Sequence, residues 1–340
     1  MDPAKSHLRD LLFGQMKAQI LRTGIKLGVF VVIDTEPKSA EEIVTTLDID
    51  PDHGYRLLRA LSYLDVLTES NGMFSLTSAG EYLTEDHPHT FKDYFLFEVS
   101  QTNSSLWPHL PSSIEDGEQN TFVREFGEPL FDHLDSNPEV ATLFNDGMES
   151  YSRLHGAEIQ ELLNGIEITE KSHVCDIGGG YGYLLCTLLF THQSLTGTVF
   201  EQPEIVEHET QHLATEFGVA DRCSYVAGDM FEAVPSADVY FLKHIIHDWN
   251  DTQAIQILTT IREHAPDDAQ LVLIEHVLPE SSSPHFASLY DMQMIVWTNG
   301  RERTPGEYAS LLEQSGWEYN ETTFDENDLL GAVKATTMPC

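Results

Sequence analysis

The sequence predicts an α/β protein in which a helical domain with a two-stranded wing precedes a doubly wound, mainly parallel sheet. Two observations predict this class. From residue 172 onward, short apolar strands alternate with helical segments, as in a parallel sheet with helical crossovers. Residues 1–105 instead contain helical segments followed by a hairpin signal. The length of 340 residues suits two domains rather than one.

Two capped helices are expected in the N-terminal domain. Ser39 stands three residues before Glu42, which is a capping box, and the helix that it starts ends near Leu47. Asp50 followed by Pro51 starts a second helix, with the aspartate as cap and the proline at the first helical position. The apolar residues of this second helix follow a helical spacing: Leu57, Leu58, Leu61 and Leu64.

A hairpin completes the order of a winged helix. Two strands, 66–69 and 73–76, flank the turn signal Asn71-Gly72. A winged helix raises the hypothesis of DNA binding, but the polar residues of its second helix are nearly neutral in sum: Asp52, His53, Arg56 and Arg59. A packing or dimerisation role is favoured instead. The first 33 residues hold more apolar side chains than one small domain needs, so we expect a symmetric homodimer.

The charge balance restricts both the partners and the setting. Lysine and arginine total 18 and aspartate and glutamate total 56, which gives a net charge of −38. A nucleic-acid partner is not expected, because binding requires a cationic face that replaces phosphate counterions. The acidic residues are spread along the chain and only eight residues are lysine. We expect a halophile whose salt-rich cytoplasm screens the self-repulsion.

No segment of the sequence indicates a membrane or a metal cofactor. There is no run of about 18 apolar residues, and the first 30 residues lack the apolar core of a secretory signal, so a cytoplasmic enzyme is expected. The four cysteines show no C-x-x-C pair and the sixteen histidines no H-E-x-x-H spacing. Cys175 and Cys186 are expected in the core, and Cys340 in the tail.

The remaining chain divides into a helical connector, 106–168, and an α/β domain, 169–340. Strands are predicted at 173–177, 197–201, 223–227, 238–242 and 270–276, and helices near 182–190, 203–217 and 252–264. Ligands of such sheets bind beyond the carboxyl ends of the strands. Candidate functional residues are therefore sought just after each strand.

A glycine-rich turn follows the first strand. Asp176 is succeeded by Gly178, Gly180 and Gly182, which lets the turn take positive φ and lets a ligand approach the backbone. Position 183 is tyrosine, so the last glycine of a dinucleotide fingerprint is absent. The turn carries neither lysine nor arginine, which argues against a phosphate-bearing cofactor.

Acidic residues end the next two strands. Glu201 lies 21 residues beyond Gly180, where a carboxylate can accept the hydroxyls of a ribose. Asp229, followed by Met230, suits an adenine, with a carboxylate for the amine and an apolar surface for the ring. A cationic nucleoside without phosphate fits this set, and S-adenosylmethionine is one.

The fourth strand is followed by the candidate base. His247 lies where a substrate proton can be met, and a neutral imidazole is a suitable base near neutral pH. Histidines after strands are also commonly structural, and that alternative stays open. Glu275, after the fifth strand, is expected to orient the imidazole of His247 and to favour its protonated form. Asp248 is assigned to helix capping, and replacement of His244 is expected to matter little.

Five segments together resemble the small-molecule O-methyltransferases of the caffeic acid and acetylserotonin type: Asp176–Gly182, Phe200–Val206, Gly228–Phe231, Lys243–Trp249 and Glu302–Thr304. Phe144–Ser152 also looks like the corresponding connector of that family. The resemblance spans nearly the whole chain. It implies a Rossmann-like class I methyltransferase domain, S-adenosyl-L-methionine as cofactor, and a winged-helix domain that forms an intertwined homodimer.

The resemblance also implies roles for individual residues. Gly178 and Gly180 would line the cofactor turn, and Glu201 would bind the ribose, although the family usually has aspartate there. The other implied cofactor contacts are Asp176 at the strand end, Asp229 and Met230 for the adenine, Lys243 for the polar edge, and Met148 and Ser152 over the methionine end.

For catalysis, the resemblance implies His247 as base with Glu275 and Glu302 on either side. The segment before Glu302 is several residues shorter than in the family. The substrate pocket would be lined by Phe144, Met294, Trp297 and Asn299. The expected reaction is methyl transfer to a hydroxyl, expected to be phenolic, of a small molecule.

Two other functions are considered. Relatives that bind S-adenosylmethionine but hydroxylate or decarboxylate a ring tend to lack the catalytic histidine, so His247 with Glu275 favours methyl transfer. A winged-helix regulator that senses a metabolite is the second alternative, and the charge balance argues against it.

Overall fold

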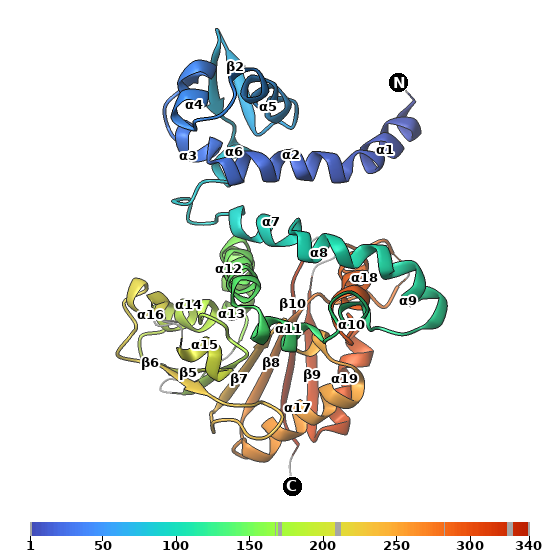
Figure 1. Ribbon diagram of the computed structural model, residues 1–340. Helices are drawn as coiled ribbons and strands as arrows, with labels where there is room; N and C mark the ends of the chain where they lie inside the picture. The colour runs from blue at the N-terminus through green and yellow to red at the C-terminus, as the bar shows by residue number, and fades with distance from the viewer. Residues whose placement is uncertain are drawn as a thin grey trace. The chain divides into compact units, whose positions relative to one another are not determined.

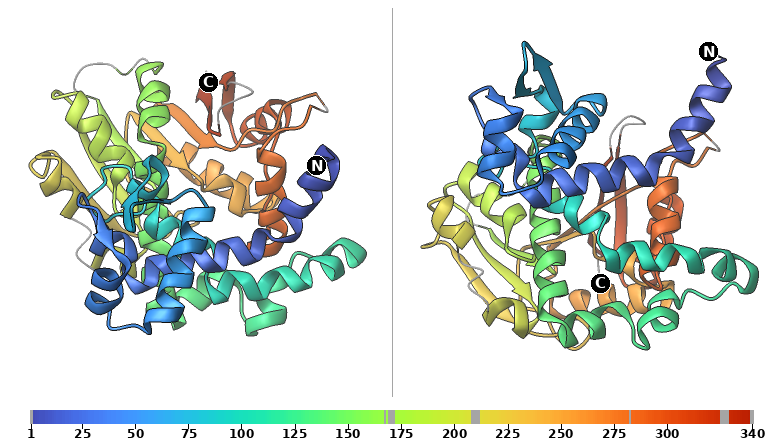
Figure 2. Two further views of the ribbon diagram at one scale, coloured as in Figure 1. Left: turned by 90° about the horizontal axis from the view of Figure 1, so that it is seen from above. Right: turned by 45° about the horizontal axis from the view of Figure 1, so that its top comes forward.

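The computed structural model describes residues 2–166, 168, 172–207, 212–281, 283–324 and 329–338. The chain forms two compact units (Figures 1 and 2). The first unit comprises Met1–Ser104 and Thr142–Leu154, and the second comprises Ser105–Ala141 and His155–Cys340. The segment 106–168, treated above as one connector, is thus divided between the two units. Cys340 lies outside the described residues.

The first unit contains the helices and the hairpin predicted from the sequence. Its elements are α1 (Pro3–Leu12), α2 (Gly14–Leu27), α3 (Val29–Ile33), β1 (Lys38–Ser39), α4 (Ala40–Thr46), α5 (Pro51–Tyr63), β2 (Leu67–Ser70), β3 (Met73–Leu76), α6 (Ser78–Glu81) and α7 (Lys92–Glu98). Strands β2 and β3 pair antiparallel, and β1 adds a third strand in the order β1-β3-β2. The wing is therefore one strand wider than predicted.

Local hydrogen bonds explain where these helices begin. Both halves of the capping box between Ser39 and Glu42 are present at the start of α4. The Asp50 carboxylate accepts the backbone N–H of His53 at 2.9 Å, which caps α5. Asn71 takes a φ of 53°, the left-handed conformation of a tight hairpin turn. These are contacts between near neighbours, so the sequence predicted them correctly.

Apolar side chains of the first unit separate into a core and an exposed set. Val29, Phe30, Leu58 and Leu61 are buried together with the inner residues of the wing. Several apolar side chains of α1 and α2 are exposed instead: Leu8, Leu11, Leu12, Phe13 and Met16. This unit therefore carries more apolar surface than its own core uses.

The second unit is built on a seven-stranded sheet. Its strands are β4 (His173–Ile177), β5 (Thr196–Glu201), β6 (Cys223–Ala227), β7 (Val239–Lys243), β8 (Gln270–Glu275), β9 (Trp317–Thr323) and β10 (Gly331–Thr337). They lie in the order β6-β5-β4-β7-β8-β10-β9. The pairs among β4 to β8 are parallel, whereas β10 runs antiparallel to both of its neighbours. The predicted class and all five predicted strands are confirmed.

Helices join and cover these strands. Described helices of the α/β part are α13 (Gly156–Asn164), α14 (Tyr183–Thr191), α15 (Pro203–Glu207), α16 (His212–Glu216), α17 (Asp251–His264), α18 (Ala287–Trp297) and α19 (Pro305–Gln314). Between the first unit's hairpin and this sheet the chain also forms α8 (Gln101–Leu106), η1 (Trp107–His109), α9 (Leu110–Asp116), α10 (Thr121–Phe126), α11 (Leu130–Ser136) and α12 (Pro138–Leu154), of which α12 lies mostly in the first unit. Among the described helices, none combines the length and the apolar character needed to cross a bilayer.

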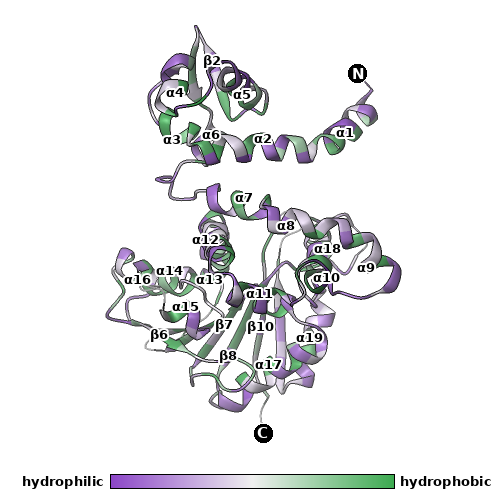
Figure 3. Cartoon of the chain, viewed as in Figure 1, coloured by the Kyte–Doolittle hydropathy of each residue, from purple (hydrophilic) through white to green (hydrophobic). Residues whose placement is uncertain are grey.

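Alternation along the strands creates two cores. Tyr240 and Leu242 belong to a cluster that also includes buried residues of α17 and α19. Val239 and Phe241, their neighbours in β7, belong to a second cluster with residues of α13 and α14. Successive side chains of a strand point to opposite faces, so a strand that is apolar at every position is covered on both sides. Figure 3 shows this concentration of apolar residues on the central strands.

The strand order reverses between β4 and β7. The connection from β4 leads outward to β5 and β6 on one side, while β7 and β8 extend the sheet on the other side. The crevice at the carboxyl ends of the two central strands is the usual ligand site of such a sheet. The glycine turn follows β4 and the candidate base follows β7, so both lie at this edge.

Candidate active site

The glycine turn after β4 is shaped by close backbone approaches. Gly178 and Gly180 have φ values of 65° and 55°. A Cβ at Gly178 would come within 2.3 Å of the end of the Ile245 side chain, and the positive φ would strain any L side chain there. The turn thus brings bare backbone to the crevice, which is what a closely bound ligand requires.

Asp176 lies beneath this turn as a buried carboxyl group. It is 1% exposed, and its Oδ2 accepts no hydrogen bond from any described residue. Burial raises the pKa of Asp176 to about 7, while the Lys243 ammonium opposes the rise. Burial likewise lowers the pKa of Lys243 to about 8, against the attraction of Asp176 and Glu275. Asp176 and Lys243 thus place one acidic and one basic group near the carboxyl ends of the adjacent strands β4 and β7.

Glu201 connects the second strand to the glycine turn. Its Oε2 accepts the Gly180 N–H at 3.0 Å and its Oε1 accepts the Gln202 N–H at 2.8 Å. Burial raises the pKa of Glu201, and both hydrogen bonds oppose the rise. The carboxylate expected to bind a ribose is therefore held beside the turn by the backbone.

Asp229 and Met230 follow β6 at the same edge of the sheet. Asp229 is exposed, and one of its carboxylate oxygens accepts the backbone N–H of Phe231 at 2.8 Å. Met230 is half-buried against the core that α17 covers. An exposed carboxylate beside an apolar side chain is compatible with the expected adenine contacts.

The candidate base lies in a short 3-10 turn, η2 (Ile246–Asp248), and is 7% exposed. His247 Nδ1 is 2.8 Å from Glu302 Oε1, a hydrogen bond between two buried groups 55 residues apart. The His247 carbonyl accepts the Arg301 N–H at 2.8 Å. The shortened loop before Glu302 therefore still brings this carboxylate to the imidazole.

The expectation that Glu275 holds the imidazole is wrong. Glu275 Oε2 is 3.6 Å from His247 Nδ1, which is too far for a hydrogen bond. Glu275 Oε1 instead accepts the backbone N–H groups of Ile245 and Ile246, at 3.2 and 2.9 Å. Glu275 thus holds the backbone of the turn, while Glu302 orients the ring. Burial raises the pKa of Glu275 to about 7 and that of Glu302 well above its ordinary value.

Two further residues adjoin His247, and one of them, Asp248, differs from its predicted role. Asp248 does not cap a helix, because the Asn250 side chain accepts the Gln253 N–H that begins α17. The Asp248 Oδ1 lies 3.8 Å from His247 Nε2, and burial raises its pKa to about 7. His244, whose replacement is expected to matter little, is half-buried and has a φ of 56°. Its ring centroid lies 5.1 Å from that of His247, so it adjoins the candidate base.

Arg303 was not predicted from the sequence, and it stabilises the backbone of the turn. Arg303 is 1% exposed, and it donates to the carbonyls of Ile246 and Trp249 at 3.0 and 2.8 Å. It also donates to the Asp251 carboxylate at 2.9 Å. The available signal in the sequence was its place directly after Glu302. A buried arginine there requires several acceptors, and the backbone of the turn provides two of them.

The predicted pocket residues fall in both units. Phe144 and Met148 are half-buried on α12, and the buried Ser152 hydroxyl donates to the Met148 carbonyl at 2.8 Å. In the second unit, Met294 and Trp297 of α18 are 3% and 8% exposed.

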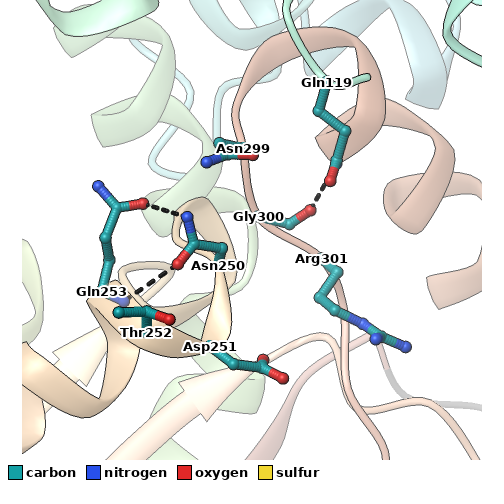
Figure 4. A pocket seen from close by; sticks show the side chains of 8 residues that line it. All are labelled: Gln119, Asn250, Asp251, Thr252, Gln253, Asn299, Gly300 and Arg301. Atoms are coloured by element: carbon teal, nitrogen blue, oxygen red, sulfur yellow. Dashed lines mark hydrogen bonds between the residues drawn. The ribbon is translucent and has the colours of Figure 1, made fainter. Parts of the chain in front are cut away.

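Asn299 lies apart from these two buried residues. It is exposed and lines a polar surface pocket of about 570 Å³ (Figure 4). The other lining residues are Gln119, Asn250, Asp251, Thr252, Gln253, Gly300 and Arg301. This pocket lies beside the segment whose backbone contacts His247, and its lining includes none of the other predicted site residues.

Comparison with known proteins agrees with the geometry. Residues 107–318 match the family model of the O-methyltransferase domain, and residues 9–86 match that of the O-methyltransferase dimerisation domain. The chain is 31% identical to the phenazine O-methyltransferase PhzM of Lysobacter antibioticus, over 93% of this chain and 91% of that protein. It is 33% identical to the O-demethylpuromycin-O-methyltransferase of Streptomyces alboniger, over 92% of this chain and 84% of that protein.

A solved structure extends the similarity to three dimensions. CalO1, a methyltransferase in calicheamicin biosynthesis crystallised in its SAH-bound form, matches with a TM-score of 0.82 and 29% identity. The match covers 99% of this chain and 100% of that one. The expected enzyme class and cofactor are confirmed by these similarities. The chain therefore belongs to the O-methyltransferase family and is an S-adenosylmethionine-dependent enzyme.

Proposed function

We propose that the enzyme methylates a phenolic hydroxyl of a small molecule with His247 as general base. The observation that carries this proposal is the 2.8 Å hydrogen bond between His247 Nδ1 and Glu302 in a buried turn at the cofactor edge of the sheet. A phenol has a pKa of about 10, so almost none is ionised at neutral pH and a base is required.

The hydrogen bond determines which nitrogen can act. We assign the Nδ1 proton to the imidazole, which donates it to an ionised Glu302 and leaves the Nε2 lone pair free. Burial raises the pKa of Glu302, and the neighbouring Arg303 guanidinium opposes this rise in favour of the ionised form. His247 Nε2 then takes the hydroxyl proton, and the imidazolium that forms is balanced by the Glu302 carboxylate, with Glu275 at 3.6 Å.

The residues of the crevice fit the cofactor that the family uses. A Cβ at Gly178 would collide with the Ile245 side chain, and the Glu201 carboxylate is held beside the turn by the Gly180 N–H. When bound, S-adenosylmethionine supplies an electrophilic methyl group on a sulfonium. We propose that Gly178, Gly180 and Glu201 bind its ribose end. The further contacts that we propose are Asp229 and Met230 for the adenine, Lys243 and Asp176 for the polar edge, and Met148 and Ser152 for the methionine end.

The acceptor is proposed to be a fused or substituted aromatic ring. The relatives named above act on a phenazine and on O-demethylpuromycin. We propose that the aromatic and apolar side chains of Phe144, Met294 and Trp297 contact the ring, and that Asn299 is a polar contact near the pocket rim. No nucleic acid partner is proposed, given the net charge of −38.

The assembly and setting follow from the surface. We propose a homodimer through residues 1–105, because Leu8, Leu11 and Leu12 are 64%, 65% and 75% exposed on α1. Residues 106–168 are proposed to contribute to the substrate pocket, and residues 169–340 to bind the cofactor. The excess of acidic residues supports a halophilic source and a salt-rich cytoplasm.

Replacement of His247 tests the proposed base. His247→Ala and His247→Asn are expected to lower turnover at saturating substrate by about 10²–10⁴-fold. The affinity for S-adenosylmethionine, measured by calorimetry, should stay within about twofold, because the proposed cofactor contacts lie elsewhere. His53→Ala is the matched control, since this histidine is exposed on α5.

The control should keep wild-type turnover and affinity. If His247→Ala also keeps near-normal turnover, this histidine is structural. The reaction would then use a substrate that ionises without a base.

A further inference from the structure

Three potential metal ligands converge behind the base. His244, His247 and Glu275 each offer a ligand atom, and these atoms all lie within 4.8 Å of one another. They come from the ends of β7 and β8, which are adjacent strands of the sheet (Figure 1), and from the turn after β7. Two imidazoles and one carboxylate form a donor set that transition-metal ions prefer.

A second observation is an oxygen of Glu275 that lies between the two imidazoles without a hydrogen-bond donor in the described part of the chain. Glu275 is 0% exposed, and its Oε2 accepts no hydrogen bond among the described residues. That oxygen lies 3.8 Å from His244 Nδ1 and 3.6 Å from His247 Nδ1. A buried carboxylate oxygen without a donor is costly, and a cation between the three groups would remove the cost.

The distances allow such an ion after a small contraction. Zinc bonds of about 2.0–2.2 Å in a tetrahedral site place neighbouring ligand atoms about 3.4 Å apart. The two measured separations from Glu275 exceed this by only a few tenths of an ångström. Glu302 Oε1 lies 2.8 Å from His247 Nδ1, and Glu302 Oε2 accepts no hydrogen bond from a described residue, so a second buried carboxylate adjoins the three groups.

We propose that His244, His247 and Glu275 form an inhibitory site for a divalent transition-metal ion, with Zn²⁺ as its preferred occupant. This ion is an inhibitor rather than a cofactor. The inhibition, but not the binding, rests on the proposed role of His247 as base.

The consequence for catalysis follows from the tautomer. An ion bound to His247 Nδ1 replaces the proton that this nitrogen donates to Glu302. A neutral imidazole metallated at Nδ1 carries its proton on Nε2, so the nitrogen that would accept the substrate proton has no free lone pair. Occupancy of the site therefore stops methyl transfer, although none of its ligands belongs to the glycine turn.

Zinc titration of the whole enzyme tests the site. After EDTA treatment and its removal, calorimetry should show one tight Zn²⁺ per chain. Turnover should fall in parallel and return when EDTA is added. Co²⁺ at the same site should give the visible absorption bands of a four-coordinate nitrogen and oxygen environment.

Two conservative variants remove single ligands. His244→Asn keeps a residue that tolerates the φ of 56°, and Glu275→Gln keeps the carbonyl oxygen for the backbone N–H groups. Each should weaken zinc binding and raise the half-inhibitory concentration at least 10-fold, and His244→Asn should abolish the Co²⁺ bands. Affinity for S-adenosylmethionine confirms that each variant is folded.

Controls exclude other zinc sites. Asp50, Asp52 and His53 form an exposed cluster with similar spacing, so the double variant Asp52→Asn/His53→Ala is the matched control. Cys223→Ser tests binding through a partly exposed thiol. Both controls should bind zinc and be inhibited like the wild type.

The proposal is overturned if the wild type binds no zinc, or if inhibition is unchanged in both ligand variants. It is also overturned if only the control variants lose inhibition. The two proposals fail separately. If His247→Ala stays active while the wild type binds zinc in a way that depends on His244, the proposed base is refuted and the metal site stands. If His247→Ala is inactive and the wild type binds no zinc, only the metal site is refuted.

Discussion

At the residue scale, the two carboxylates near His247 have different tasks. Glu302 accepts the imidazole N–H, while Glu275 accepts two backbone N–H groups of the turn. Glu302→Gln places an amide beside Nδ1 that can donate instead of accept, which favours the wrong tautomer. We expect turnover to fall on the order of 10²-fold or more, since the base contribution itself is of that size.

Glu275→Gln is the comparison variant. Its amide oxygen can still accept both backbone N–H groups, so turnover should fall less than about 10-fold. Steady-state kinetics with both variants decide between the assignments. A larger loss for Glu275→Gln than for Glu302→Gln would mean that Glu275 is the orienting group after all.

Asp176 gives a prediction on pH. Its pKa is raised by burial from 3.8 to about 7, so the folded protein binds this proton more tightly than the unfolded chain does. The stability that the bound proton contributes is complete below pH 3.8 and is lost as the pH rises to about 7. Asp176→Asn cannot ionise and avoids this loss.

The melting temperatures of Asp176→Asn and wild type should therefore diverge across this pH range. The variant should gain on the wild type as the pH rises and be the more stable protein above pH 7, in the absence of cofactor. Asp52→Asn, at an exposed position of α5, is the charge-matched control and should show a flat difference. A flat difference for Asp176→Asn would contradict the burial argument.

At the scale of elements, the turn η2, which carries the proposed base, depends on a residue from a distant segment. Arg303 supplies donors to the carbonyls of Ile246 and Trp249 on both sides of His247. Arg303→Met removes the side-chain donor of both carbonyls, and the Ile246 carbonyl then keeps only the 3.3 Å hydrogen bond from the Trp249 N–H. Each buried acceptor that loses its donor costs about 1–3 kcal/mol. We expect a lower melting temperature and a loss of turnover, because His247 is no longer held.

Arg301→Met is the matched control for this element. Arg301 is 51% exposed and pairs with Glu307 at the surface, where an ion pair contributes about 0–1 kcal/mol. Differential scanning calorimetry and steady-state kinetics should leave this control near wild type. Equal effects of the two variants would indicate that Arg303 has no special part in holding the turn.

At the scale of the whole molecule, charge determines the conditions under which the fold is stable. A net charge of −38 opposes both compaction and association of two copies at low salt. We expect the melting temperature to rise strongly between about 0.1 and about 3 M KCl, over which the Debye length falls from about 10 Å to below about 3 Å. Light scattering over the same range should show dimers at high salt. A melting temperature independent of salt would contradict the halophilic interpretation.

Features set by near neighbours could be predicted from the sequence. The caps at Ser39 and Asp50, the turn at Asn71 and the five parallel strands are all present. Each of these depends on spacing within a few residues. The strands are apolar at every position, and a parallel sheet covered by helices on both faces is the arrangement that buries such strands. The position of His247 at the carboxyl-end edge of the sheet followed from strand order alone.

The tertiary structure alone decided the rest. Strands β9 and β10 were not predicted, because β9 is largely exposed and lacks an apolar run. The hydrogen-bond partner of His247 could not be identified from the sequence, since 55 residues separate His247 from Glu302 in the chain. The raised pKa of Asp176 likewise arises from burial beneath a turn. Sequence spacing encodes contacts along one element, whereas distances between elements depend on how the whole sheet and its helices pack.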